Sequence, residues 1–161
     1  MSAIGGVALL ATACGGSSSG RYGSSAAPTA TTAPAAPAQT ATTVDLGTTK
    51  LGSILVDGQG RSLYLFEADK ANASACTSAG CVAEWPPLLA GGTPQVGAGL
   101  AAQQLGTTTR ADGAHQVTYS GHPLYYFAGD TTPGVTAGQG LNDNGGLWYV
   151  VRTDGTALDN S

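Results

Sequence analysis

From Val44 onward, apolar and polar residues alternate with a period of two in short runs, and no stretch keeps apolar residues at helical spacing for three turns. Each run is bounded by Gly, Asp or Ser, which suit the tight turns of hairpins. The pattern therefore predicts a small all-β, antiparallel domain built from hairpins. The predicted strands are Ser53–Val56, Ser62–Phe66, Thr107–Arg110, Gln116–Tyr119, Pro123–Phe127 and Leu147–Val151.

Long, irregular loops are predicted around Cys76–Cys81 and Gly91–Gly99. A short helix near Gly99–Gln104 is an open alternative to a plain loop. Gly134–Gly146 is rich in Gly, Asn and Asp but lacks the acidic spacing of a calcium loop, so it also predicts an irregular loop. Residues 153–161 predict a polar tail, which places the folded domain at residues 44–152.

Two stretches of this domain resemble each other without gaps: VDGQGRSLYLFEAD from Val56 and VTYSGHPLYYFAGD from Val117. The identical pairs are Val56/Val117, Gly60/Gly121, Leu63/Leu124, Tyr64/Tyr125, Phe66/Phe127 and Asp69/Asp130, and each copy is followed by a tryptophan, Trp85 or Trp148. A single hairpin is not stable in water. We therefore expect two related units, about 51–90 and about 107–152, packed as one pseudo-symmetric domain.

The first 13 residues, MSAIGGVALLATA, are small and apolar and end directly before Cys14. This run is too short to span a bilayer, which takes roughly 20 apolar residues, and it is typical of a secretory signal peptide. A cysteine at this place resembles the lipobox of bacterial lipoproteins. The resemblance implies cleavage by signal peptidase II and a diacylglyceryl thioether on Cys14. The alternative is an ordinary thiol in a leader.

Residues 14–43 form a second segment of distinct composition, because Gly15–Thr43 consists almost wholly of Gly, Ser, Ala, Pro and Thr. Such a segment cannot bury enough apolar surface to offset its ordering entropy. The sequence therefore predicts a disordered tether over residues 14–43. A lipid anchor followed by a tether predicts a domain held at the extracytoplasmic face of the cell membrane.

Cys76 and Cys81 remain once Cys14 is assigned to the lipid. In an exported protein such a pair is by default a disulfide, and so short a loop adds only about 2 kcal/mol of stability. A structural zinc site needs four ligands, and no second Cys pair or spaced His pair accompanies these two. A redox-active pair stays open, although the spacing differs from that of thioredoxin-like motifs.

Both copies carry a Tyr-x-Phe-x-x-Asp motif. It reads Tyr64-x-Phe66-x-x-Asp69 in the first copy and Tyr125-x-Phe127-x-x-Asp130 in the second. With the Cys76–Cys81 loop, Trp85 and Trp148, the paired motif resembles that of bacterial lipoproteins with a Tyr-x-(Phe/Trp/Tyr)-x-x-Asp signature. That family is also described as a secreted repeat of unknown function. The resemblance covers about Leu51 to Arg152; it implies an extracytoplasmic lipoprotein and brings no established activity.

Two interpretations of the motif stay open. Tyr64 and Phe66 lie two apart in a strand, so both rings point to one face of the sheet, and Asp69 follows where a carboxylate can accept backbone N–H bonds. This favours an aromatic core with a turn aspartate in each copy. The alternative is a ligand cleft across the pseudo-twofold axis. The candidate cleft residues are Tyr64, Phe66, Asp69, Trp85, Tyr125, Phe127, Asp130 and Trp148.

Charge and residue counts narrow the function. Six Lys+Arg against ten Asp+Glu give a net charge of −4, so no basic surface for nucleic acid is predicted. Two His and one Met leave few transition-metal ligands, so no metal or other cofactor is predicted. No known catalytic motif is present. We therefore expect a non-enzymatic module that binds an envelope protein or a small ligand. The alternative is an accessory redox or electron-transfer protein that uses the Cys76–Cys81 loop and the aromatic residues.

Overall fold

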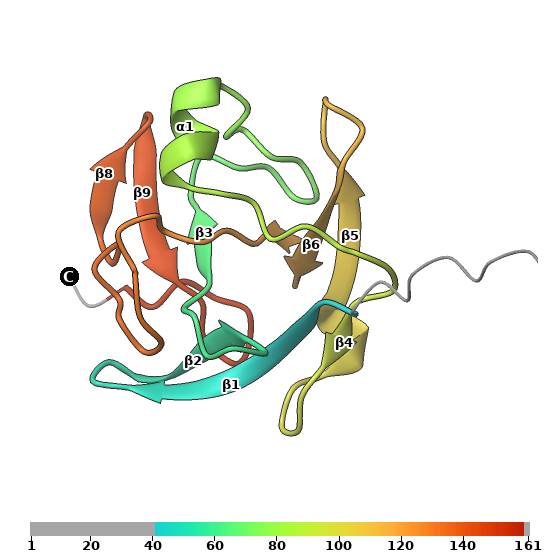
Figure 1. The fold of residues 1–161 in the computed structure, drawn as a ribbon, viewed down its shortest axis with the longest axis vertical. Coiled ribbons are helices and arrows are strands. Elements are labelled where there is room, and N and C mark those ends of the chain that lie inside the picture. The colour runs from blue at the N-terminus through green and yellow to red at the C-terminus, as the bar shows by residue number, and fades with distance from the viewer. Residues whose placement is uncertain (1–40, 160–161) are drawn as a thin grey trace, which may run out of the picture. The chain divides into compact units, whose positions relative to one another are not determined.

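The computed structural model describes residues 41–159, and within them the chain is almost entirely β, which confirms the predicted fold class (Figure 1). The strands are β1 (Thr43–Thr49), β2 (Gly52–Asp57), β3 (Tyr64–Phe66), β4 (Gln95–Val96), β5 (Leu105–Thr109), β6 (His115–Tyr119), β7 (His122–Pro123), β8 (Leu141–Asp143) and β9 (Gly146–Val150). The helical elements are α1 (Ala79–Glu84) and the 3-10 turn η1 (Ala102–Gln104). The signal peptide, Cys14 and the tether up to residue 40 lie outside the described residues.

The strands form three small sheets with the orders β2-β1-β4, β5-β6-β7 and β3-β9-β8. Strands β1 and β2 form a long antiparallel hairpin in the first repeat, and β5 and β6 form its counterpart in the second. Strand β4 is the exception in direction, because it pairs with β1 in parallel. Strands β3 and β9 pair with each other, and Figure 1 shows them above the β1–β2 hairpin and to the left of β5 and β6.

Each repeat packs its last segment against the other repeat. Strand β9, from the second repeat, pairs with β3 of the first, with Phe66 opposite Trp148. The corresponding segment of the first repeat, residues 84–88, lies against the second: the Leu88 N–H donates to the Leu124 carbonyl at 2.9 Å. The two predicted units are therefore interwoven, and every central pairing joins residues far apart in sequence.

The hydrogen bonds correct the ungapped alignment, which pairs Val56 with Val117. The N–H of Leu55 donates to the Val151 carbonyl at 2.8 Å, and the N–H of Val117 donates to the equivalent Leu88 carbonyl at 2.8 Å. Leu55, not Val56, is thus the structural partner of Val117. The first turn holds one more residue than the second, which is a tight turn with positive φ at Ser120–Gly121.

Helix α1 was not predicted, because six residues are too few to show a helical period. Its start carries a recognisable signal: the Ser78 hydroxyl accepts a hydrogen bond from the Cys81 N–H at 3.2 Å, as an N-cap does. The short helix left open near Gly99–Gln104 exists as the 3-10 turn η1. The predicted strand Pro123–Phe127 is wrong beyond Pro123 as a regular strand, because only isolated bridges from Tyr125 to Tyr64 and to Pro87 continue it.

The predicted polar tail is wrong up to residue 159. Leu158 is buried, and its N–H donates to the Val150 carbonyl at 2.9 Å. The chain turns back at Arg152, whose N–H donates to the Thr156 carbonyl at 2.9 Å, so residues 153–159 pack on the last strand. One apolar residue among polar neighbours supplies this anchor, and no periodic pattern marks it. Among residues 41–159, no helix has the length and apolar character needed to cross a bilayer.

Candidate functional site

The two motif tyrosines meet at the centre of the domain. The N–H of Tyr64 donates to the Tyr125 carbonyl at 2.9 Å, and the N–H of Tyr125 donates back to the Tyr64 carbonyl at 2.9 Å. Both residues are fully buried. This reciprocal pair relates the two repeats by an approximate twofold axis that passes between the tyrosines.

The hydroxyls of the same tyrosines reach across this axis. Tyr64 Oη donates to Asp130 Oδ2 at 2.5 Å, and Tyr125 Oη donates to Asp69 Oδ2 at 2.9 Å. Each tyrosine therefore bonds the aspartate of the other repeat and not the one in its own motif. The paired motif is a crossed clasp, four side chains that close one repeat on the other.

The aspartates also shape the turns after their strands. Asp69 Oδ1 accepts the N–H of Ala75 at 2.7 Å, and Asp130 Oδ1 accepts the N–H of Ala137 at 2.9 Å. Both side chains are half-buried. The predicted turn aspartate is therefore present in each copy, with the crossed tyrosine bond as an addition that the spacing within one copy does not reveal.

Four aromatic rings form a row beside the clasp, in which the first three rings are stacked face to face and the fourth is tilted by 35°. In order they are Phe66, Trp148, Trp85 and Phe127, with ring centroids 4.1, 4.0 and 4.6 Å apart. The tyrosine rings meet the tryptophans edge-on, at 5.5 Å for Tyr64 on Trp85 and 5.1 Å for Tyr125 on Trp148. Offset and edge-to-face contacts of this kind stabilise a core beyond the area that they bury. This four-ring stack follows the same approximate twofold axis.

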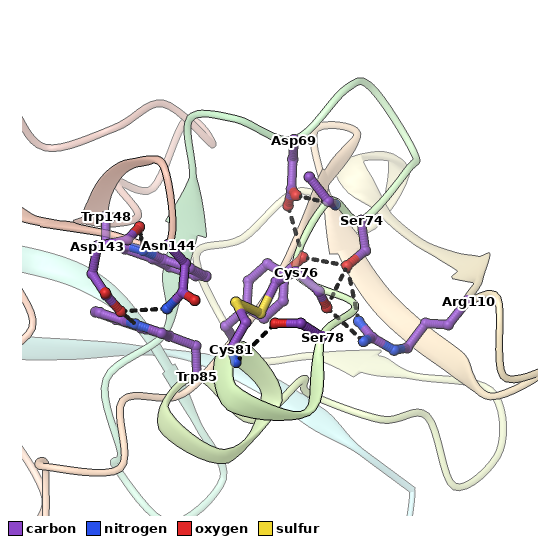
Figure 2. The surroundings of a disulfide bond; sticks show 12 residues. Asp69, Ser74, Cys76, Ser78, Cys81, Trp85, Arg110, Asp143, Asn144 and Trp148 are labelled. Atoms are coloured by element: carbon purple, nitrogen blue, oxygen red, sulfur yellow. Dashed lines mark hydrogen bonds between the residues drawn. A yellow bond between two sulfur atoms is a disulfide. The ribbon is translucent and has the colours of Figure 1, made fainter.

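Asp143 completes the stack and has no counterpart in the first repeat. The Trp85 indole N–H donates to its carboxylate at 2.9 Å, and the Trp148 indole N–H donates to its backbone carbonyl at 3.0 Å (Figure 2). The bond from Trp85 lowers the pKa of the Asp143 carboxyl. Sequence reasoning assigned this residue to an irregular loop, because nothing in its spacing indicates that it serves both indoles.

Cys76 and Cys81 form a buried disulfide, as predicted. Arg110, itself buried, holds the disulfide loop: its Nη2 donates to the Cys76 carbonyl at 2.7 Å and its Nη1 to Ser74 Oγ at 2.9 Å (Figure 2). Nη1 also donates to Gln116 Oε1 at 2.6 Å, which ties the loop to β6. Sequence reasoning missed Arg110. The single signal in the sequence is that a charged residue stands at the end of a predicted strand.

Burial governs the protonation of the clasp. It raises the pKa of the Asp69 carboxyl to about 6, although the Ala75 N–H, the Tyr125 hydroxyl and the Arg110 charge all favour the carboxylate. Burial likewise raises the pKa of Asp130. Burial and the facing carboxylates raise the pKa of both tyrosine hydroxyls well above the ordinary value. The hydroxyls thus stay protonated and donate at neutral pH.

The open ligand cleft that was one interpretation of the motif is not formed. Tyr64, Tyr125, Trp85 and Trp148 are each 0% exposed, and Phe66 is also buried. Phe127, Asp69 and Asp130 keep partial exposure. The motif residues build an aromatic core, as the other interpretation predicts. Within the described chain, no three His, Cys, Asp or Glu side chains lie close enough together to hold a metal ion.

Two hollows on the surface are lined by residues other than the Tyr, Phe and Asp of the motif. One, of 520 Å³, is lined by Asp57, Arg61 and Tyr126 together with residues 41–43 and 87–89. The Arg61 guanidinium lies 4.1 Å from the Tyr126 ring centroid and 2.7 Å from Asp57 Oδ2. Another hollow, of 440 Å³, lies between β4 and β5. These two hollows are therefore formed at the surface of the domain, outside the buried aromatic core.

Comparison with known proteins gives one match. A family model described as a secreted repeat of unknown function matches residues 46–89 and 106–152, more than half of the chain. No curated protein and no solved structure matches it significantly. The two matched segments coincide with the two interwoven repeats, and the match confirms the resemblance drawn from the motif. The chain therefore belongs to the family described as a secreted repeat of unknown function.

Proposed function

We propose that this protein is a non-enzymatic binding module, anchored by lipid to the extracytoplasmic face of the cell membrane. The observation that carries the proposal is the crossed clasp. The hydroxyls and carboxylates of the paired motif, its most reactive groups, bond one another and backbone N–H groups. A catalytic acid, base or nucleophile must reach a substrate, and these groups are engaged in holding the fold.

The rigid core supports a binding role. The clasp, the four-ring stack and the disulfide fix the centre of the domain, so the loops and strand edges around it are presented on a stable scaffold. Preformed surfaces bind with a smaller ordering cost than mobile ones. The partner belongs to the cell envelope, an envelope protein or a small ligand, because the sequence assigns the domain to that compartment.

The anchor rests on Cys14 and on the composition of residues 14–43. A tether of Gly, Ser, Ala, Pro and Thr keeps the domain clear of the membrane while a diacylated cysteine supplies stable attachment. The test is native intact-mass spectrometry of the protein extracted from its own membranes. We expect a chain that begins at Cys14, carries the diacylglyceryl mass and is lighter by two hydrogen atoms because of the disulfide.

The matched control is Cys14→Ala, which leaves residues 41–161 unchanged. We expect this variant to keep residues 1–13 and to lose the lipid mass. Wild-type protein with an unmodified Cys14 and an intact leader would refute the anchor. A cofactor that survives extraction and adds mass to the wild-type chain would refute the non-enzymatic binding role.

A second candidate function is electron transfer, and the packing of the core favours it. The Cys76–Cys81 disulfide lies in the same buried cluster as the four-ring stack and the two motif tyrosines. Equilibration of the native protein in glutathione buffers of graded potential, read by thiol labelling, tests it. Reversible reduction with an unchanged fold supports electron transfer. A disulfide that is reduced only as the domain unfolds makes the pair structural.

A further inference from the structure

The outer edges of β1 and β5 are equivalent in the two repeats but differ in what covers them. On β1, strand β4 occupies the edge: the N–H of Gln95 donates to the Thr42 carbonyl at 2.9 Å, and the N–H of Gly97 donates to the Val44 carbonyl at 2.8 Å. The structural match of Leu55 with Val117 makes Val44 of β1 equivalent to Leu105 of β5.

No strand of residues 41–159 covers the equivalent edge of β5. The N–H of Arg110 bonds the Ala114 carbonyl across the β5–β6 hairpin. Because strands alternate, the backbone groups of Thr107 and Thr109 point away from β6. No described residue bonds these outward groups, and both threonines are exposed.

The two edges differ because the two repeats continue differently after the segment that each packs against the other. In the first repeat the chain runs on from Leu88 to β4 and reaches β1. In the second it turns back at Arg152, and Leu158 bonds Val150 of β9 instead. The edge of β5 therefore lacks the strand that the approximate twofold symmetry assigns to it.

The space beside this edge is a slot with two strand walls. The hollow of 440 Å³ is lined by Gln95 and Val96 of β4 and by Leu105 to Thr107 of β5. Since Gln95 and Gly97 bond β1, the backbone of Val96 faces the slot. None of the residues that line it is charged, and β5 itself, Leu-Gly-Thr-Thr-Thr, carries no Lys or Pro that would block an added strand.

We propose that this slot binds an uncharged, extended segment of a partner protein, which adds a strand parallel to β5 as β4 does to β1. Bonds to Thr107 on one side and to Val96 on the other join the β2-β1-β4 and β5-β6-β7 sheets into one. Backbone bonds give such a mode its affinity, and the uncharged walls select the segment. The inference deepens the proposed binding function and rests on it.

The test uses the full chain and a phage-displayed library of short, uncharged peptides. A selected peptide is synthesised, its affinity is measured by calorimetry, and amide exchange is followed by mass spectrometry. We expect slower exchange at Thr107 and Thr109 with peptide bound. Thr107→Pro, which removes an outward N–H, should weaken binding about tenfold. The matched control is Thr48→Pro, which also follows a glycine and removes an outward N–H, but from β1.

A second measurement is independent of whether the variants fold. Two versions of the peptide are N-methylated, one at the odd-numbered amides and one at the even-numbered amides. The version whose methylated amides face the strand edge should not bind, whereas the other should bind as the unmethylated peptide does. Selection of no peptide, equal binding to Thr107→Pro, or protection confined to other segments would overturn the slot. Protection of β5 in the free chain would also overturn it. If that protection disappears on dilution, a second copy occupies the edge; if it disappears on deletion of residues 15–40, that segment occupies it. Failure of the lipid anchor is read separately, from the mass of Cys14.

Discussion

Replacing Tyr64 by Phe removes the hydroxyl that donates a 2.5 Å hydrogen bond to Asp130 of the other repeat. A hydrogen bond to a charged group contributes about 1.5–3 kcal/mol. The same hydroxyl accepts the N–H of the buried Gly138 at 3.3 Å, and an unpaired buried N–H costs about 1 kcal/mol more. We therefore expect Tyr64→Phe to lower the free energy of unfolding by about 2–4 kcal/mol.

The assay is urea unfolding followed by tryptophan fluorescence, because the two tryptophans of the chain both lie in the four-ring stack. For a domain of this size the loss corresponds to a fall in Tm of roughly 8–15 °C. The matched control is Tyr149→Phe, a buried tyrosine that lies outside the crossed clasp. Its free energy of unfolding should change by less than about 0.5 kcal/mol.

A double-mutant cycle tests the crossing itself. Tyr64→Phe combined with Asp130→Asn should show a coupling of about 1–2 kcal/mol, whereas Tyr64→Phe combined with Asp69→Asn should be additive within about 0.5 kcal/mol. The opposite order, with Tyr64 coupled to Asp69 of its own motif, would refute the exchange of strands between repeats. Equal couplings would refute the pairing that the clasp requires.

Three further predictions follow from the same geometry. Because burial raises the pKa of the Asp69 carboxyl from 3.8 to about 6, the folded state holds this proton more tightly than the unfolded state, so the contribution of Asp69 to stability should be greatest below about pH 4 and fall by about 1–2 kcal/mol as the pH rises through 6; urea unfolding of wild type and Asp69→Asn between pH 4 and 7 checks it, and the variant should lack this part of the slope. Gly138→Ala places a Cβ 2.8 Å from the Trp85 ring and should cost about 1–3 kcal/mol, whereas Gly80→Ala meets nothing within 4 Å and should not destabilise; calorimetry of the two variants compares them. A chain cut within residues 97–101 should yield two pieces that unfold cooperatively only when mixed, as circular dichroism would show, because each completes the other's sheet; cooperative unfolding of either piece alone would contradict the interweaving.

The sequence was a reliable guide where structure is local. Period-two runs and Gly-containing turns located the β5–β6 hairpin and the strands around Tyr64 and Trp148, because alternation and turn chemistry act over a few residues. Strand β1 (Thr43–Thr49) is not among the predicted strands, because its Thr-rich composition matches the preceding segment, and its first residue falls within the predicted tether.

The crossed clasp was beyond sequence reasoning because the two copies are alike. Tyr64 and Tyr125 stand in the same local pattern, so nothing in either copy states whether its tyrosine bonds Asp69 or Asp130. Pairing between distant strands is decided by the whole fold, as the exchange of β9 shows. Residues without a counterpart in the other copy, such as Asp143, were missed for a related reason, because comparing the two copies reveals only the positions that they share.

The repetition explains why the motif pairs a tyrosine with an aspartate at a fixed distance. A single copy would leave the Tyr64 hydroxyl in an apolar core with no carboxylate to bond, at a cost comparable to a lost buried hydrogen bond. With two copies, one spacing satisfies both tyrosines at once, and the same side chains shape the turns that follow each strand. The motif thus specifies how the repeats join. Differences between them, such as the uncovered edge of β5, are then the places where we propose that a partner binds.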